Sequence, residues 1–194
     1  MEKKDIAKHL ASWGWQVKKD NVGDKSGKLS LPDREVWVHW TLRGLYRRET
    51  RRRTQKLGLS PSITTIEFSK MTCYIDNAKS YETWPIQVFP SAFFREEETI
   101  NIDHLKAVSE EAIAWAKEQD LNACLQKHAN LPTDAPGSAP LKHLTSLAIL
   151  GDVDKLKYYQ TSFENGDRLG FVPYIKKNYI DRAYAAASES SQSS

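Results

Sequence analysis

The chain has 194 residues, 40% of them hydrophobic, which suffices for one substantial core or for one core with a smaller appendage. No segment approaches the roughly 18 to 20 consecutive apolar residues that cross a bilayer, so we expect a folded protein that needs no membrane. Two isolated cysteines, Cys73 and Cys124, and an N-terminus without an apolar leader indicate a reducing cytoplasm and no secretory signal.

The N-terminal segment predicts a helix followed by a short strand. Apolar side chains recur at helical spacing from Ile6 to Trp13, and Gly14 suits a left-handed C-cap that ends the helix. We expect a strand over Trp15–Lys18. The segment Asn21–Lys28 is rich in glycine, aspartate and lysine, which predicts a turn.

Alternating apolar residues predict the strands of a sheet. The segment Glu35–Leu42 has a strict period of two, with an apolar face made of Val36, Val38, Trp40 and Leu42. A second strand is predicted over Ser62–Asp76, where the apolar phase changes near Ser69. That change predicts a β-bulge or a break into two strands. A further strand over Trp84–Val88 would end near Pro90.

A long helix is predicted after the acidic run Glu96–Glu98, which we interpret as a solvated face in front of it. The helix would extend from Asn101 or Asp103 to about His128. The apolar residues of its stripe are Leu105, Val108, Ala112, Trp115 and Ala116. Residues 130–140, with three prolines and a glycine, then predict a linker.

The C-terminal part predicts three helices over residues 141–150, 152–164 and 178–187. Asp152 and Asp154 suit a helix N-cap and first turn, not a metal site. The segment Pro140–Leu156, with Pro-Leu before the first helix and Gly151 at the turn, resembles one helix-turn-helix unit of an ankyrin repeat. Because an ankyrin array needs about three stacked units, the resemblance implies a single helical hairpin.

The next segment, Phe163–Ile175, resembles the closing stretch of an uncharacterised bacterial domain family. That family has no established activity, so the resemblance implies no functional residue. Gly166 and Gly170 permit turns, and Asp167 and Arg168 are interpreted as groups that satisfy the loop or each other.

Together these elements predict an α+β fold with an antiparallel sheet of three to five strands. An N-terminal helix and a long central helix pack on the sheet, and a helical appendage follows. The predicted parts are a sheet domain (1–129), a Pro-rich linker (130–140), a helical hairpin with a final helix packed on the first part (141–187) and a disordered tail (188–194). Small bacterial immunity proteins and secretion chaperones are similar in layout, an analogy of fold and size alone.

We find no catalytic, metal-binding or cofactor motif. The histidines are dispersed singly, and neither HExxH, CxxC, a P-loop nor GxGxxG occurs, so we predict no metal, no cofactor and no enzymatic activity. Cys73 could form a nucleophile pair with His39, if the two lie on neighbouring strands, or with His104. A strand histidine between Trp37 and Trp40 is more often a packing residue, which is the interpretation we favour.

The positive charge is concentrated in one segment, Arg43–Lys56, which we call the basic run. It holds seven of the 28 basic residues and one glutamate, a charge of +6, so the other 180 residues of this +3 chain sum to −3. Such contrast indicates a surface for an acidic or phosphate-bearing partner. The candidate binding residues are Tyr46, Arg47, Arg48, Arg51, Arg52, Arg53 and Lys56.

Three interpretations of the basic run remain open. A mobile loop or exposed helix between two strands could dock on an acidic protein, bind nucleic acid through its phosphates, or simply protect strand edges from aggregation. We favour the first, because the remaining chain is acidic and no recognition helix appears. The leading prediction is a non-enzymatic protein-binding protein, of the immunity-type inhibitor or effector-chaperone kind, whose partner is an acidic toxin or effector. The alternative is a nucleic-acid-associated protein that uses the basic run.

Overall fold

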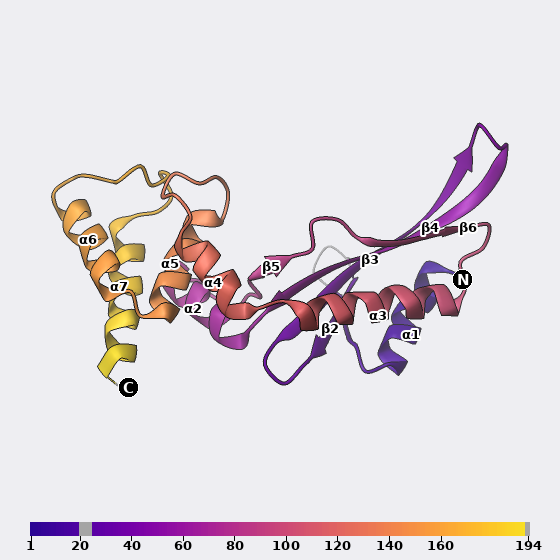
Figure 1. Ribbon diagram of the computed structural model, residues 1–194, viewed down its shortest axis with the longest axis horizontal. Coiled ribbons are helices and arrows are strands. Elements are labelled where there is room, and N and C mark those ends of the chain that lie inside the picture. Colours follow the sequence, from indigo (N-terminus) through magenta and orange to yellow (C-terminus); the bar gives the residue numbers. More distant parts are fainter. Residues whose placement is uncertain (20–24, 193–194) are drawn as a thin grey trace. The chain divides into compact units, whose positions relative to one another are not determined.

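The computed structural model describes residues 1–19 and 25–192 and confirms the α+β fold (Figure 1). The chain forms two compact units. The first combines Met1–Ile63 with Gln87–Gln119, and the second combines Thr64–Ile86 with the chain from Asp120 onward. Each unit is therefore assembled from segments that are separated in sequence.

The first unit is built on a six-stranded sheet in the order β1-β2-β3-β4-β5, with β6 also paired to β4. The strands are β1 (Gln16–Lys19), β2 (Lys25–Ser30), β3 (Glu35–Arg47), β4 (Arg52–Thr64), β5 (Gln87–Val88) and β6 (Phe93–Glu97). The pairs β1–β2, β2–β3, β4–β5 and β4–β6 are antiparallel. Antiparallel strands joined by hairpins can pack one face on helices and leave the other open.

Two helices cover one face of this sheet. Helix α1 (Lys3–Ser12) buries Ile6 and Leu10 completely and contacts β1 and β2, and α3 (Ile102–Glu118) contacts β3 and β6. The covered strand residues include Val38, Leu57 and Leu59. As predicted, Gly14 follows α1 with a left-handed φ of 90°, after which β1 begins. The other face of β3, with Trp37, His39, Thr41 and Arg43, is what we call the open face.

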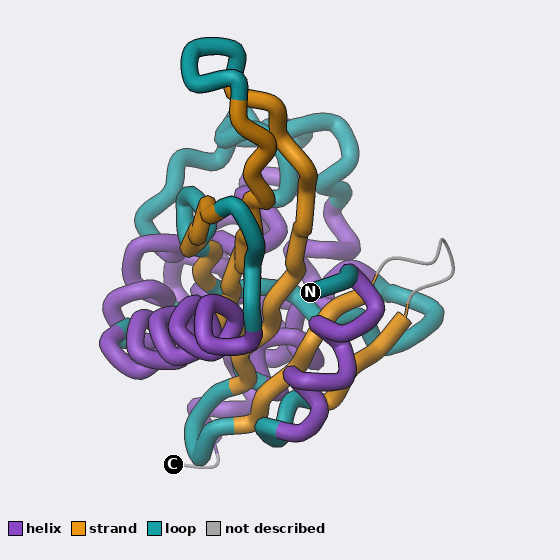
Figure 2. Tube along the Cα trace, turned by 90° about the vertical axis from the view of Figure 1, so that its right-hand side faces the viewer, coloured by secondary structure: helices purple, strands orange, loops and turns teal. Residues whose placement is uncertain are grey.

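The basic run forms strands, contrary to the mobile loop or exposed helix that we predicted. β3 continues past Leu42 to Arg47, and β4 starts at Arg52, so residues 48–51 alone make the turn. Figures 1 and 2 show this β3–β4 hairpin extending beyond the other strands of the sheet. The prediction failed because the segment is dominated by charged residues, so the sequence showed no alternating apolar pattern typical of a strand. Cross-strand hydrogen bonds hold such a hairpin without an apolar stripe of its own.

The segment Ser62–Asp76 is a strand only up to Thr64, and the predicted bulge does not exist. Helix α2 (Ile66–Asp76) follows, because the Thr65 hydroxyl accepts a hydrogen bond from the amide of Phe68 (3.0 Å) and caps it. Phe68, Thr72 and Ile75 are buried at helical spacing. The apparent change of strand phase near Ser69 was this helical period.

Three other strand predictions also need correction. β2 covers residues 25–28 of the predicted turn, and the remainder of that turn, residues 21–24, lies outside the described residues. The predicted strand Trp84–Val88 is reduced to β5. β6 was missed, because its last residues belong to the acidic run that we interpreted as a solvated face.

The second unit is helical. It contains α2, α4 (Leu121–Ala129), α5 (Ala139–Leu150), α6 (Val153–Glu164) and α7 (Lys177–Gln192). Its core gathers Ile75, Leu144, Leu147, Leu156 and Ile180. The last three helices confirm the sequence prediction, with Gly151 at a φ of 71° and Asp152 capping α6.

Two boundaries differ from those predicted. The long helix to His128 is interrupted at Gln119, whose ψ of 127° is extended, and Asp120 caps the separate helix α4. At the C-terminus α7 continues through Gln192, so residues 188–192 are helical, and residues 193–194 lie outside the described residues. The Pro-rich segment 130–140 lies within the second unit.

Candidate functional site

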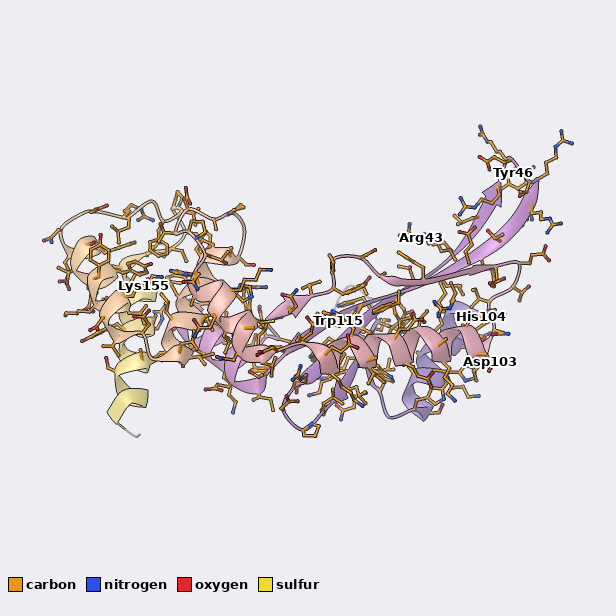
Figure 3. All side chains as sticks on the ribbon, in the orientation of Figure 1. Arg43, Tyr46, Asp103, His104, Trp115 and Lys155 are labelled. Carbon is orange, nitrogen blue, oxygen red and sulfur yellow. The ribbon has the colours of Figure 1, made fainter. Side chains whose placement is uncertain are left out.

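The predicted binding residues all lie on the outer part of the β3–β4 hairpin. Tyr46 and Arg47 end β3, Arg48 and Arg51 lie in the turn, and the remaining three begin β4. Tyr46 is 59% exposed although it is a large aromatic residue. Figure 3 shows Tyr46 near the tip and Arg43 further back along the hairpin, among side chains that project on both sides. Their charge and exposure make this hairpin the candidate functional site.

Strand β6 neutralises part of the hairpin. Arg47 makes a two-point contact with Glu96, in which Nε donates to Oε1 at 2.7 Å and Nη2 to Oε2, and Thr54 donates to the same carboxylate at 2.9 Å. This contact lowers the pKa of Glu96 and raises that of Arg47, because each group favours the charged form of the other. At Arg52, where β4 begins after the turn, Nη1 lies 3.1 Å from Oε1 of Glu98.

Other cations of the basic run form no ion pair within the described residues. Within the described part of the chain, Arg43, Arg48, Arg51 and Arg53 form no ion pair. Lys56 instead places its ammonium 4.0 Å from the ring centroid of Phe94 on β6. Lys56 also lies opposite Glu96 in the β4–β6 register, and its charge helps to lower the pKa of that carboxyl without forming an ion pair.

The outer half of β3 is also an unpaired sheet edge. β2 pairs with β3 only from Glu35 to His39. In the described ranges, no strand adjoins the segment from Trp40 to Arg47 on the side away from β4. Backbone amides and carbonyls on such an edge are free to pair with an added strand.

Cys73 and His39 do not lie on neighbouring strands, as the nucleophile pair would have required. Cys73 lies on α2 in the second unit, where its sulfur contacts the backbone nitrogen (3.3 Å) and carbonyl oxygen (3.4 Å) of Glu82. His39 is exposed on the open face of the first unit. Among residues 1–19 and 25–192, no three His, Cys, Asp or Glu side chains group as metal ligands.

These features define a class: an α+β protein with a six-stranded antiparallel sheet, a long basic hairpin and a separate helical unit. The chain belongs to a family of unknown function, DUF6990, whose model matches residues 2–188. This match confirms the prediction of an uncharacterised domain family and extends it beyond Phe163–Ile175 to nearly the whole chain. No curated protein and no solved structure matches the chain.

Two further observations complete the site. None of the described helices is both long and apolar enough to span a membrane.

The sequence analysis did not identify Glu96 and Glu98 as the acidic partners of the hairpin, although the acidic run Glu96–Glu98 was visible. The missed signal was alternation: Phe94 and Glu96 share one face of β6, and Phe93, Arg95 and Glu97 share the other.

Proposed function

We propose that this chain is a non-enzymatic binding protein whose β3–β4 hairpin docks on an acidic surface of a partner protein. The observation that carries the proposal is the contact between the hairpin and β6. Glu96 on β6 and Glu98, just after the end of β6, pair with Arg47 and Arg52. Carboxylates carried by a segment that runs along the hairpin therefore suit its geometry, and its remaining arginines are available for a second set.

The open edge of β3 supports one mode of docking. An extended acidic segment of a partner would pair with the backbone between Trp40 and Arg47, while its carboxylates reach Arg43 and Arg48. The backbone pairing would provide affinity, and the arginine charges would select acidic segments over other extended segments. The same arginines would repel the edge of a second copy of the chain, which disfavours self-association.

Masking of a partner by such docking is the mode of action of an immunity-type inhibitor or an effector chaperone. Neither role requires a catalytic group, and we propose this kind of role for the chain. The two cysteines, Cys73 and Cys124, form no disulfide. Cysteines that are not joined in a disulfide suit a reducing cytoplasm, which we propose as the location of the chain.

The test is charge reversal in the turn, with Arg48→Glu combined with Arg51→Glu. Partners are first captured with the wild-type chain from its native host and identified, and each is then purified for calorimetry. We expect at least a tenfold loss of affinity for an acidic partner, since two charged contacts become repulsive. The control combines Lys8→Glu with Lys117→Glu on α1 and α3, which are exposed cations of the same unit. An equal loss in control and test variants would refute docking by the hairpin.

Nucleic-acid binding is the second candidate, favoured by the exposed Tyr46 beside unpaired arginines. On the open face, Trp37 also lies under two ammonium groups, Lys18 at 5.5 Å and Lys28 at 5.9 Å from its ring. Aromatic rings among cations can stack on unpaired bases. Fluorescence anisotropy with 20-nucleotide single strands, at about 50 mM salt where phosphate contacts are strongest, tests it. Undetectable binding would eliminate this candidate, and a loss specific to Tyr46→Ala would support it.

A further inference from the structure

A pocket on the open face of the sheet adjoins the hairpin but excludes its turn. It is lined by Thr41 and Arg43 of β3, Lys56 and Ser60 of β4, and Ser91, Ala92 and Phe94, and its volume is about 360 Å³. We call it the sheet-face pocket. All these residues belong to the first unit. We propose that the sheet-face pocket binds a phosphate monoester.

The charge of the pocket points to an anion. Two of the lining side chains, Arg43 and Lys56, are cationic, and no carboxylate lines the pocket. Within the described residues, neither Arg43 nor Lys56 forms an ion pair; Lys56 lies over the ring of Phe94, and its charge also acts on Glu96, its register partner on β6. Two cations without an ion pair on one concave surface favour a ligand with two negative charges, which a phosphate monoester carries near neutral pH.

The hydroxyl groups of the pocket distinguish a phosphate from a carboxylate. Thr41, Ser60 and Ser91 have no hydrogen-bond partner for their side chains among the described residues. Together with the guanidinium and the ammonium they make five donor groups. A carboxylate has only two oxygens, whereas a phosphate monoester presents three equivalent acceptor oxygens on a tetrahedral centre.

The size and the wall of the pocket favour an ester over inorganic phosphate. A volume of about 360 Å³ is larger than a bare phosphate needs and lies at the lower end of small-ligand pockets. Phe94, 44% exposed, offers an aromatic surface for the group that is esterified. That group could be an amino-acid side chain or a nucleoside, and the two sources are separated by the choice of probe.

The second unit provides an internal comparison. Its pocket of about 380 Å³ is lined by Lys70, Lys79 and Arg182, among others. Arg182 is already occupied, because its guanidinium donates to the carbonyl of Ile75 at the C-terminal end of α2. The carbonyls at a helix C-terminus disfavour anions. Lys70 and Lys79 therefore serve as control positions with the same charge in a pocket of similar size.

Calorimetry of the full chain with O-phosphoserine and adenosine 5′-monophosphate tests the proposal, with serine and adenosine as uncharged controls. We expect both phosphate esters to bind, and the tighter of the two identifies the source. Arg43→Gln and Lys56→Gln should each weaken binding by about tenfold, because each removes a charged hydrogen bond. Lys70→Gln, Lys79→Gln and Arg48→Gln should leave it unchanged. Since Arg48 belongs to the proposed docking surface, failure of docking and failure of the pocket are distinguishable.

A substitution that leaves the charge unaltered separates the pocket from general attraction. Gly58 lies beneath it, and a Cβ there would stand 3.0 Å from Cε1 of Phe94 and 3.1 Å from Oγ1 of Thr41. Gly58→Ala should therefore displace two lining residues and weaken phosphoserine binding several-fold, with circular dichroism verifying the fold. The proposal is overturned if neither ester binds, or if Lys79→Gln weakens binding as much as Arg43→Gln does. Should Gly58→Ala fail to fold, the Arg43 and Lys79 variants decide the question.

Discussion

His143 on α5, in the second unit, is completely buried. Its Nδ1 lies 3.0 Å from the carbonyl oxygen of His128, and its Nε2 lies 3.0 Å from the hydroxyl of Tyr159. A carbonyl only accepts, so Nδ1 carries the proton and Nε2 accepts from Tyr159. Burial lowers the pKa of His143 to about 4 and raises that of Tyr159 to about 12, since each charged form would lose its hydration.

This burial predicts a loss of stability in mild acid. The unfolded chain protonates His143 near its ordinary pKa of 6.5, whereas the folded protein does so only near a pKa of 4, so acid favours unfolding. The free energy of unfolding should fall by roughly 3 kcal/mol from this group between those pH values, and the group should have no effect above 6.5. Urea titrations should show the stability gap between wild type and His143→Gln narrowing with acid. An imidazole that titrates near 6.5 by NMR would contradict this.

At the hairpin, Glu96 should compete with any acidic partner. Glu96→Gln frees Arg47 from its two-point contact, so we expect elution from a heparin column at higher salt than for wild type. The control is Glu97→Gln, which makes the same change of charge on the same strand at a residue without an ion pair among those described. Equal elution of the two variants would show that only net charge matters.

At the scale of elements, local capping groups determine where helices begin. Asp120 accepts a hydrogen bond from the amide of Ala123 at 3.0 Å, and this bond starts α4 directly after α3 ends. Asp120→Ala should lower the free energy of unfolding by about 1 kcal/mol, measured in urea. Asn122→Ala, an exposed position in the same helix, should stay within about 0.5 kcal/mol of wild type. A similar loss in both variants would argue against capping.

The elements show which parts of the structure local patterns can reveal. The C-terminal helices were predicted because glycine and aspartate mark their ends and apolar residues their faces. The strand predicted over Ser62–Asp76 was wrong because its β-branched and apolar residues fit the period of a strand and also that of a helix. The helix cap at Thr65 was overlooked. For the site, the basic residues were evident in sequence. Their pairing with Glu96 was not, because it joins residues 49 positions apart.

The whole molecule is divided in a way that its linear sequence conceals. The second unit includes Thr64–Ile86, which lies between the two segments of the first unit. A fragment of residues 1–119 would retain α2 without α5 and α7, its partners in the helical core. Phe68 and Ile75 are fully buried in the whole chain, and in the fragment they would lose most of the second unit, to which they belong.

We therefore expect the 1–119 fragment to bind a hydrophobic dye and to aggregate, unlike the full chain, because large apolar surfaces promote association. Dye fluorescence and light scattering measure both effects. A fragment that lacks residues 64–86 as well, with Ile63 joined to Gln87 by a short glycine linker, is the matched control and should bind less dye. A monomeric 1–119 fragment without dye binding would contradict this division of the core.

Because the second unit is made of two separate segments of the sequence, its helices are not synthesised one directly after another. α2 ends at Asp76, but α5, which packs against it, begins only at Ala139. At a synthesis rate of about 5 to 20 residues per second, the apolar face of α2 stays uncovered for several seconds until α5 has been synthesised. During that interval the nascent chain displays Phe68 and Ile75 to its surroundings. We therefore expect ribosome-associated chaperones to bind the nascent chain as α2 emerges.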